Sequence, residues 1–122
     1  MIGERGVSRV VRRKPNPGCE EAYENLLKGM LEASKMVSEL VDLLMETHQI
    51  TEDRVILGGF SQGSMVTTDV ALRLKNTPGG LIVMSGTLVC KSIWSELSKK
   101  QKMLKIIQSH GRQDPILPFE AA

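Results

Sequence analysis

The turn Gly59-Phe60-Ser61-Gln62-Gly63 places a serine hydroxyl between two glycines, in the pattern Gly-x-Ser-x-Gly. A short apolar run, Val55-Ile56-Leu57, precedes this turn, and a helical pattern over residues 62–75 follows it. A serine on a sharp strand-to-helix turn holds its hydroxyl clear of the sheet, where it can attack a substrate. The alternative is a tight turn with an inert serine, and the flanking strand and helix favour the nucleophile.

The small residues of this turn have a steric explanation. We expect a Cβ at Gly59 or at Gly63 to collide where strand and helix pass closely, and Ser64 is small enough for the same crowding. The start of the following helix presents unpaired N–H groups and the positive end of its dipole. Both favour an oxyanion that develops during attack on a carbonyl group.

Strand and helix patterns alternate around this turn. Apolar runs predict strands at residues 55–57, 81–84 and 105–109, and residues 87–103 form a mixed excursion. A long helix is predicted from about Glu20 to Thr47, with a core-facing stripe at three- and four-residue steps. The stripe consists of Leu26, Met30, Ala33, Val37, Leu40, Val41, Leu44 and His48. This alternation predicts an α/β fold with a parallel sheet core and flanking helices.

The chain of 122 residues is long enough for one domain at most. Residues 1–18 carry the basic cluster Arg12-Arg13-Lys14 and end in a proline-rich break, which predicts an arm ahead of a domain over residues 19–122. The net charge of +2 is too small to predict a nucleic-acid partner. No apolar run is long enough to cross a membrane.

Cysteine and histidine are too few and too widely spaced to predict a metal site or a bound cofactor. Cys19 and Cys90 lie outside any Cys-x-x-Cys pattern, and His48 and His110 are far apart in the sequence. Two reduced thiols indicate a cytoplasmic protein, although a disulfide between them stays open.

Three segments, in this order, resemble the carboxylesterase/phospholipase branch of the α/β-hydrolases, a group that includes acyl-protein thioesterases. They are Ile50–Gly63 with the string Gly-Gly-Phe-Ser-Gln-Gly, Leu81–Gly86, and His110-Gly111-x-x-Asp114 with Pro118. The likeness runs from about Glu20 to Pro118. It implies a partial α/β-hydrolase fold and a serine hydrolase that acts on small-molecule carboxylic esters or thioesters.

The resemblance also implies roles for individual residues. Ser61 is the nucleophile, the backbone N–H of Gln62 supplies one half of the oxyanion hole, and Asp114 orients the catalytic histidine. The position of Asp114 agrees with this role, because it follows the carboxyl end of a strand, where open α/β sheets place their sites.

In this family the catalytic histidine follows the aspartate after one more strand, whereas this sequence ends at Ala122. We therefore expect the chain to correspond to the middle of such an enzyme. For His48 and His110 we expect structural roles rather than that of the base. The alternative function is a catalytically impaired or inactive truncated homologue that forms a homo-oligomer through exposed sheet edges.

Overall fold

The computed structural model describes residues 17–114 and Ile116, with side chains from Glu24 onward. In chain order, the elements are α2 (Pro17–His48), the 3₁₀ turn η1 (Glu52–Arg54), β1 (Ile56–Phe60), α3 (Gln62–Arg73), β2 (Gly80–Met84), α4 (Lys91–Ser98) and β3 (Ile106–Ser109). The predicted alternation of strand and helix is confirmed. The predicted basic arm lies outside the described residues, except that Pro17 and Gly18 already belong to α2.

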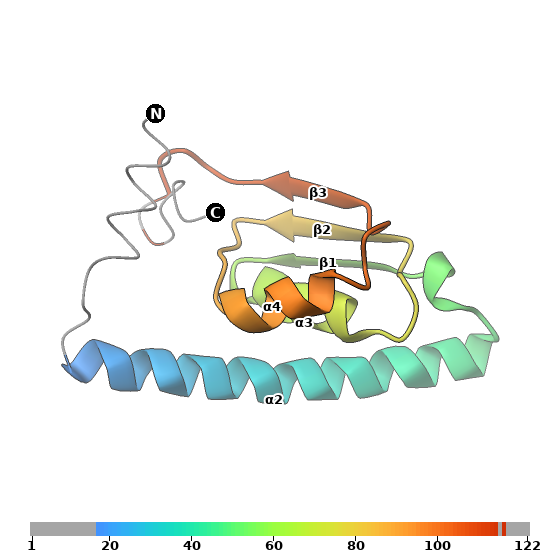
Figure 1. Cartoon of the computed structure of the whole chain (residues 1–122), viewed down its shortest axis with the longest axis horizontal. Coiled ribbons are helices and arrows are strands. Elements are labelled where there is room, and N and C mark those ends of the chain that lie inside the picture. The colour runs from blue at the N-terminus through green and yellow to red at the C-terminus, as the bar shows by residue number, and fades with distance from the viewer. Residues whose placement is uncertain (1–16, 115, 117–122) are drawn as a thin grey trace.

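The three strands of the described part form one parallel sheet in the order β1-β2-β3 (Figure 1). Leu57, Leu81 and Ile106 lie in register, and so do Phe60, Met84 and Ser109. The carboxyl ends of the three strands therefore meet at one edge of the sheet. This is the parallel α/β architecture predicted from the sequence, and it corresponds to part of an α/β-hydrolase fold.

The two faces of the sheet differ sharply in exposure. Leu57 and Leu81 point toward the helices and are buried in the core. Alternate residues of a strand point to opposite faces, and on the opposite face Ile56 and Phe60 are each 66% exposed and Ile107 is 68% exposed. The described helices thus cover one face and leave an apolar surface on the other.

Helix α3 links the layers of the molecule, because it packs against β1, β2, α2 and α4 (Figure 1). The buried apolar side chains of α3 lie between Met65 and Leu72. The core that they form with the other elements consists of Met30, Val41, Leu57, Met65, Val66, Val70, Ala71, Leu72, Leu74, Leu81, Cys90 and Trp94. The helix that begins at the candidate site is therefore also the centre of the core.

Helix α2 is one continuous helix of 32 residues, and Gly29 does not divide it. The predicted stripe is only partly correct. Met30 and Val41 are buried as predicted, whereas four other members are exposed: Leu26, Leu40, Leu44 and His48. Ser34 is buried between them because its hydroxyl donates to a buried carboxylate on α3. His48, the last residue of the helix, is exposed.

The connection between α3 and β2 is closed by Gly79. Its N–H donates to the carbonyl oxygens of Val55, at 2.8 Å, and Glu52, at 3.1 Å. A Cβ at Gly79 would lie 2.5 Å from the carbonyl oxygen of Asp53, so a larger residue does not fit. Gly80 then pairs with Ile56 and begins the strand. These backbone contacts determine where β2 starts relative to β1.

Two further findings concern the helices. The excursion predicted at residues 87–103 contains α4, whose Trp94 side chain is buried. Among the described residues, no helix combines the length and the apolar character needed to cross a membrane.

Candidate active site

Ser61 occupies the junction of β1 and α3 with a backbone conformation that is rare for a residue with a side chain. Its φ is 54° and its ψ is −122°. Such conformations are strained and occur preferentially at functional positions. The N–H of Ser61 donates to the carbonyl oxygen of Met84 at 2.8 Å, which anchors the turn to the neighbouring strand.

Gly59 allows this turn to form, and Gly63 does so in a different way from the one predicted. A Cβ at Gly59 would collide with the backbone carbonyl group of Gly63 and would lie 2.6 Å from the N of Ser64. The prediction is confirmed for Gly59. It is wrong for Gly63, where an added Cβ would meet no described atom within 4 Å. Gly63 contributes the backbone that crowds Gly59, while its own missing side chain would point into open space.

The carbonyl oxygen of Ser61 accepts three hydrogen bonds from the first turn of α3. The donors are the N–H of Ser64 at 3.0 Å, the N–H of Met65 at 3.4 Å and the Oγ of Ser64 at 2.5 Å. Gln62 is the first residue of α3, and its side chain is exposed. Backbone N–H groups in the first turn of a helix have no carbonyl partner within the helix. The N–H groups of Ser64 and Met65 already bond the carbonyl of Ser61, so the N–H groups that the helix leaves without a carbonyl partner are those ahead of them, of Gln62 and Gly63.

Asp114 lies in the loop that follows β3. Its Oδ1 accepts the N–H of Ile116 at 2.9 Å, and its Oδ2 lies 3.8 Å from Nε2 of His110. The side chain of His110 is only 2% exposed, whereas that of Asp114 is 20% exposed. An ion pair between the two forms only when the imidazole is protonated.

Ser61 and the His110–Asp114 pair share the edge at which the strands end. Ser61 follows β1 and His110 follows β3, and the last residues of these strands are in register through Met84. Adjacent strands lie about 4.8 Å apart, so the ends of β1 and β3 are separated by about 10 Å. The predicted serine and carboxylate are thus on one rim with β2 between them.

His48 is placed at the other end of the sheet. It ends α2, and the chain then enters η1 and β1, so this histidine lies beside the amino ends of the strands (Figure 1). Its position excludes it as a base for Ser61 within the described structure.

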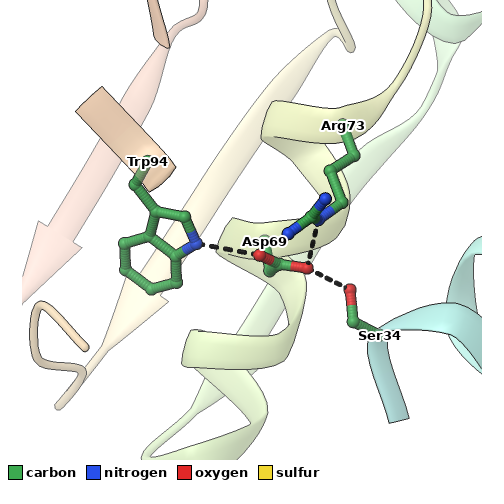
Figure 2. Close-up of polar contacts among 4 residues, drawn as sticks. All are labelled: Ser34, Asp69, Arg73 and Trp94. Atoms are coloured by element: carbon green, nitrogen blue, oxygen red, sulfur yellow. Dashed lines mark hydrogen bonds and ion pairs between the residues drawn. The ribbon is translucent and has the colours of Figure 1, made fainter. Parts of the chain in front are cut away.

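A buried carboxylate, Asp69, joins helices α2, α3 and α4 (Figure 2). Its Oδ2 accepts hydrogen bonds from Ser34 Oγ at 2.5 Å and from Arg73 Nε at 2.8 Å, and its Oδ1 accepts one from Trp94 Nε1 at 2.9 Å. The sequence reasoning did not identify this cluster. The feature of the sequence that could have indicated it is a charged residue, Asp69, among the apolar positions of α3.

The charge of Asp69 affects two ionisable groups. Burial raises the pKa of its carboxyl, but the hydrogen bonds from Arg73, Ser34 and Trp94 outweigh that effect, and the pKa lies below its ordinary value. For Cys90, burial and then the negative charge of Asp69 raise the pKa of the thiol, against a smaller opposing effect of Arg73. Cys90 is a free thiol. The side chain of Cys19 lies outside the described part.

A cavity of about 260 Å³ lies between α3, α4 and the last two strands. Its walls include Leu81, Val83, Ile106 and the indole of Trp94, and Gly86 of the loop after β2 also lines it. The cavity is mainly apolar and is adjacent to the first turn of α3. Within the described residues, no three His, Cys, Asp or Glu side chains are grouped in a way that would hold a metal ion.

The chain is similar to known proteins over most of its length. Residues 19–122 match the phospholipase/carboxylesterase family. Acyl-protein thioesterase 1 of Debaryomyces hansenii is 29% identical over 106 residues, which cover 86% of this chain and 44% of that protein. Acyl-protein thioesterase 1 of Schizosaccharomyces pombe is 34% identical over 91 residues, which cover 74% of this chain and 40% of that protein. The chain thus spans less than half the length of these relatives.

Proposed function

Because the chain belongs to the phospholipase/carboxylesterase family of α/β-hydrolases, we propose that it hydrolyses carboxylic esters or thioesters with Ser61 as the nucleophile. The observation that carries this proposal is the backbone of Ser61, held at φ 54° between β1 and α3. A strained serine at the carboxyl edge of a parallel sheet presents its hydroxyl to a bound acyl group. The thioesterase relatives favour a substrate with an acyl carbonyl group.

The proposed reaction follows the usual course for a serine nucleophile. The Oγ of Ser61 attacks the acyl carbonyl carbon while its proton passes to a base, and the carbonyl oxygen becomes an oxyanion. The N–H of Gln62 donates to that oxyanion. Collapse of the intermediate expels the alcohol or thiol, which takes up the proton. Water then hydrolyses the acyl-enzyme and restores Ser61.

The base in this proposal is a histidine that Asp114 orients and that is neither His48 nor His110. Asp114 supports this role because it lies on the same rim as Ser61 and is partly accessible at 20% exposure. His110 is a poor candidate for the base, because its ring is buried beside Asp114. In addition, His110 follows β3, which is separated from β1 by β2. We propose a structural role for His110, in which it packs the loop that carries Asp114.

The apolar cavity beside α3 is the proposed site for the acyl chain. Its walls of Leu81, Val83 and Ile106 suit a hydrocarbon chain, and Ser64 and Met65, which follow Ser61 by one helical turn, also line it. A cytoplasmic location is part of the same proposal, because the free Cys90 thiol suits a reducing compartment.

The test is labelling with a fluorophosphonate probe beside hydrolysis of p-nitrophenyl acetate. In active protein, Ser61→Ala should abolish labelling and lower turnover by about 10⁴-fold or more, because the nucleophile is lost. Ser85→Ala is a matched control, since Ser85 directly follows β2 as Ser61 follows β1 and also has a positive φ of 52°. Equal labelling of wild type and Ser61→Ala would remove Ser61 from the mechanism.

A second candidate function is a catalytically impaired homologue that acts through self-association. The apolar face with Ile56, Phe60 and Ile107 favours it, because exposed apolar surface and unpaired strand edges promote association. This candidate predicts a dimer or larger species by light scattering together with absent labelling of Ser61. Rapid labelling would contradict it.

A further inference from the structure

The Ser64 hydroxyl lies directly behind the candidate nucleophile. Its side chain is 0% exposed, and its Oγ donates to the carbonyl oxygen of Ser61 at 2.5 Å. Two backbone N–H groups already bond that oxygen, so the hydroxyl is a third donor to one carbonyl group.

The surroundings of Ser64 hold its hydroxyl in this orientation. On the far side, the turn after β2 approaches so closely that a Cβ at Gly86 would lie 2.5 Å from Ser64 Oγ and 2.8 Å from Val83 Cγ1. On the near side, the backbone N of Ser64 lies where a Cβ at Gly59 would be only 2.6 Å away. Ser64 is therefore enclosed between β1, β2 and its own helix, and its Oγ faces the carbonyl group of Ser61.

The acceptor of this hydrogen bond belongs to the same peptide group as the proposed oxyanion donor. The carbonyl of Ser61 and the N–H of Gln62 share one planar trans unit, in which the two bonds point in opposite directions. Fixing the direction of the carbonyl therefore fixes the direction of the N–H. A hydrogen bond to the carbonyl also polarises the peptide, which makes its N–H a stronger donor.

We propose that Ser64 is a positioning residue, whose hydroxyl aligns and polarises the Ser61–Gln62 peptide so that the N–H of Gln62 is directed at the oxyanion. This inference rests on the proposed function for its catalytic consequence, but the alignment itself can be measured without turnover. An alanine at this position would fill nearly the same space, so the hydroxyl is the feature that the proposal concerns.

The experiment compares Ser64→Ala with Thr67→Val in the full chain. Thr67 Oγ1 also donates to carbonyl oxygens of the first turn, those of Gly63 at 3.0 Å and Ser64 at 3.1 Å, but not to that of Ser61. Both variants thus lose a hydroxyl from the same turn. In isotope-labelled protein, we expect Ser64→Ala to move the Ser61 carbonyl carbon and the Gln62 amide nitrogen upfield. Thr67→Val should leave both signals nearly unchanged.

Fluorophosphonate labelling provides the second measurement. Loss of an oxyanion donor costs about 10²–10³-fold in rate, so its misalignment in Ser64→Ala should slow labelling by about tenfold. Thr67→Val should label at the wild-type rate, and thermal unfolding of both variants controls for general loss of stability.

Each outcome bears on the proposal. Unchanged Ser61 and Gln62 signals in Ser64→Ala would overturn it, and so would labelling at the wild-type rate in a protein whose Ser61 reacts. If wild type labels no faster than Ser61→Ala, the proposed hydrolase function fails, and the nuclear magnetic resonance comparison alone decides the role of Ser64.

Discussion

Asp69 carries its negative charge at a position where none of its side chain reaches solvent. Burying an ionised carboxylate is costly unless hydrogen bonds replace those of water. Here the three donors come from α2, α3 and α4. Ser34 of α2 and Trp94 of α4 hold α3 against its two helical neighbours, and Arg73 balances the charge from within α3.

We predict that Asp69→Ala lowers the free energy of unfolding by about 3 kcal/mol, because three donors lose their acceptor inside the core. The chain has one tryptophan, Trp94. Its fluorescence therefore reports urea unfolding of the described domain without interference. Lys99→Ala removes an exposed ion pair with Glu96 and should change stability by less than about 1 kcal/mol. Equal losses in the two variants would contradict the role given to Asp69.

The charge of Asp69 also makes a pH-dependent contribution to stability. Its pKa is lower in the folded protein than the value near 3.9 of an unfolded chain. The contribution is therefore complete above about pH 4 and is lost as the pH falls through the folded pKa. We predict that the stability difference between wild type and Asp69→Asn is constant near neutrality and narrows below about pH 4. A difference that does not change with pH would contradict this assignment.

At the scale of elements, the turn from β1 to α3 depends on the close backbone contact between Gly59 and Gly63. Gly59 faces the backbone of Gly63, whereas an added Cβ at Gly63 would meet no described atom within 4 Å. Neither glycine has a positive φ. Both backbones are therefore compatible with alanine, and only the contact at Gly59 prevents it.

We predict opposite effects for alanine at these two glycines. Gly59→Ala should lower the free energy of unfolding by about 2 kcal/mol or more, because backbone atoms must move apart. Gly63→Ala should raise it by about 0.5–1 kcal/mol, because alanine favours the helix. Urea denaturation of the two variants measures both. Destabilisation of similar size at the two positions would show that the turn tolerates neither.

The sequence predicted the strands, the serine turn and the helix after it, because apolar runs and glycines are local signals. It predicted the buried side of α2 only in part, since a hydropathy pattern cannot show that Ser34 has a partner 35 residues away. Helix α4 was missed because polar residues alternate with its apolar ones, and the partner of its buried Trp94, Asp69, is 25 residues away in the sequence. The order of the strands was enough to predict that Ser61 and Asp114 lie on the same edge of the sheet. The contact between His110 and Asp114 could be seen only in the structure.

At the scale of the whole molecule, one face of the sheet is covered by no helix of the described residues and is an exposed apolar surface. Ile56, Phe60 and Ile107 expose most of their side chains there. Gly58 and Ile82 lie between them on the same face, as the strand register requires. A surface of this kind favours association with other apolar surfaces.

We predict that the wild-type chain forms dimers or larger species at micromolar concentrations, and that Ile107→Lys shifts the population toward monomer. The reason is that a lysine ammonium is costly to bury against another apolar surface. Met103→Lys is the matched control, since Met103 is also exposed but lies outside the sheet. Light scattering coupled to size exclusion measures the mass of each. A monomeric wild type would contradict the prediction.

The contacts of Gly79 have a consequence for changes in chain length. Because its N–H bonds to Val55 and Glu52 set the first pair of β2, one residue inserted just after it would shift the strand by a single step. Side chains of a strand alternate, so the shift would exchange its inside and outside. Leu81 would turn to water and Ile82 toward α3. Loops elsewhere in such folds tolerate extra residues, but we expect this connection to have a strictly conserved length.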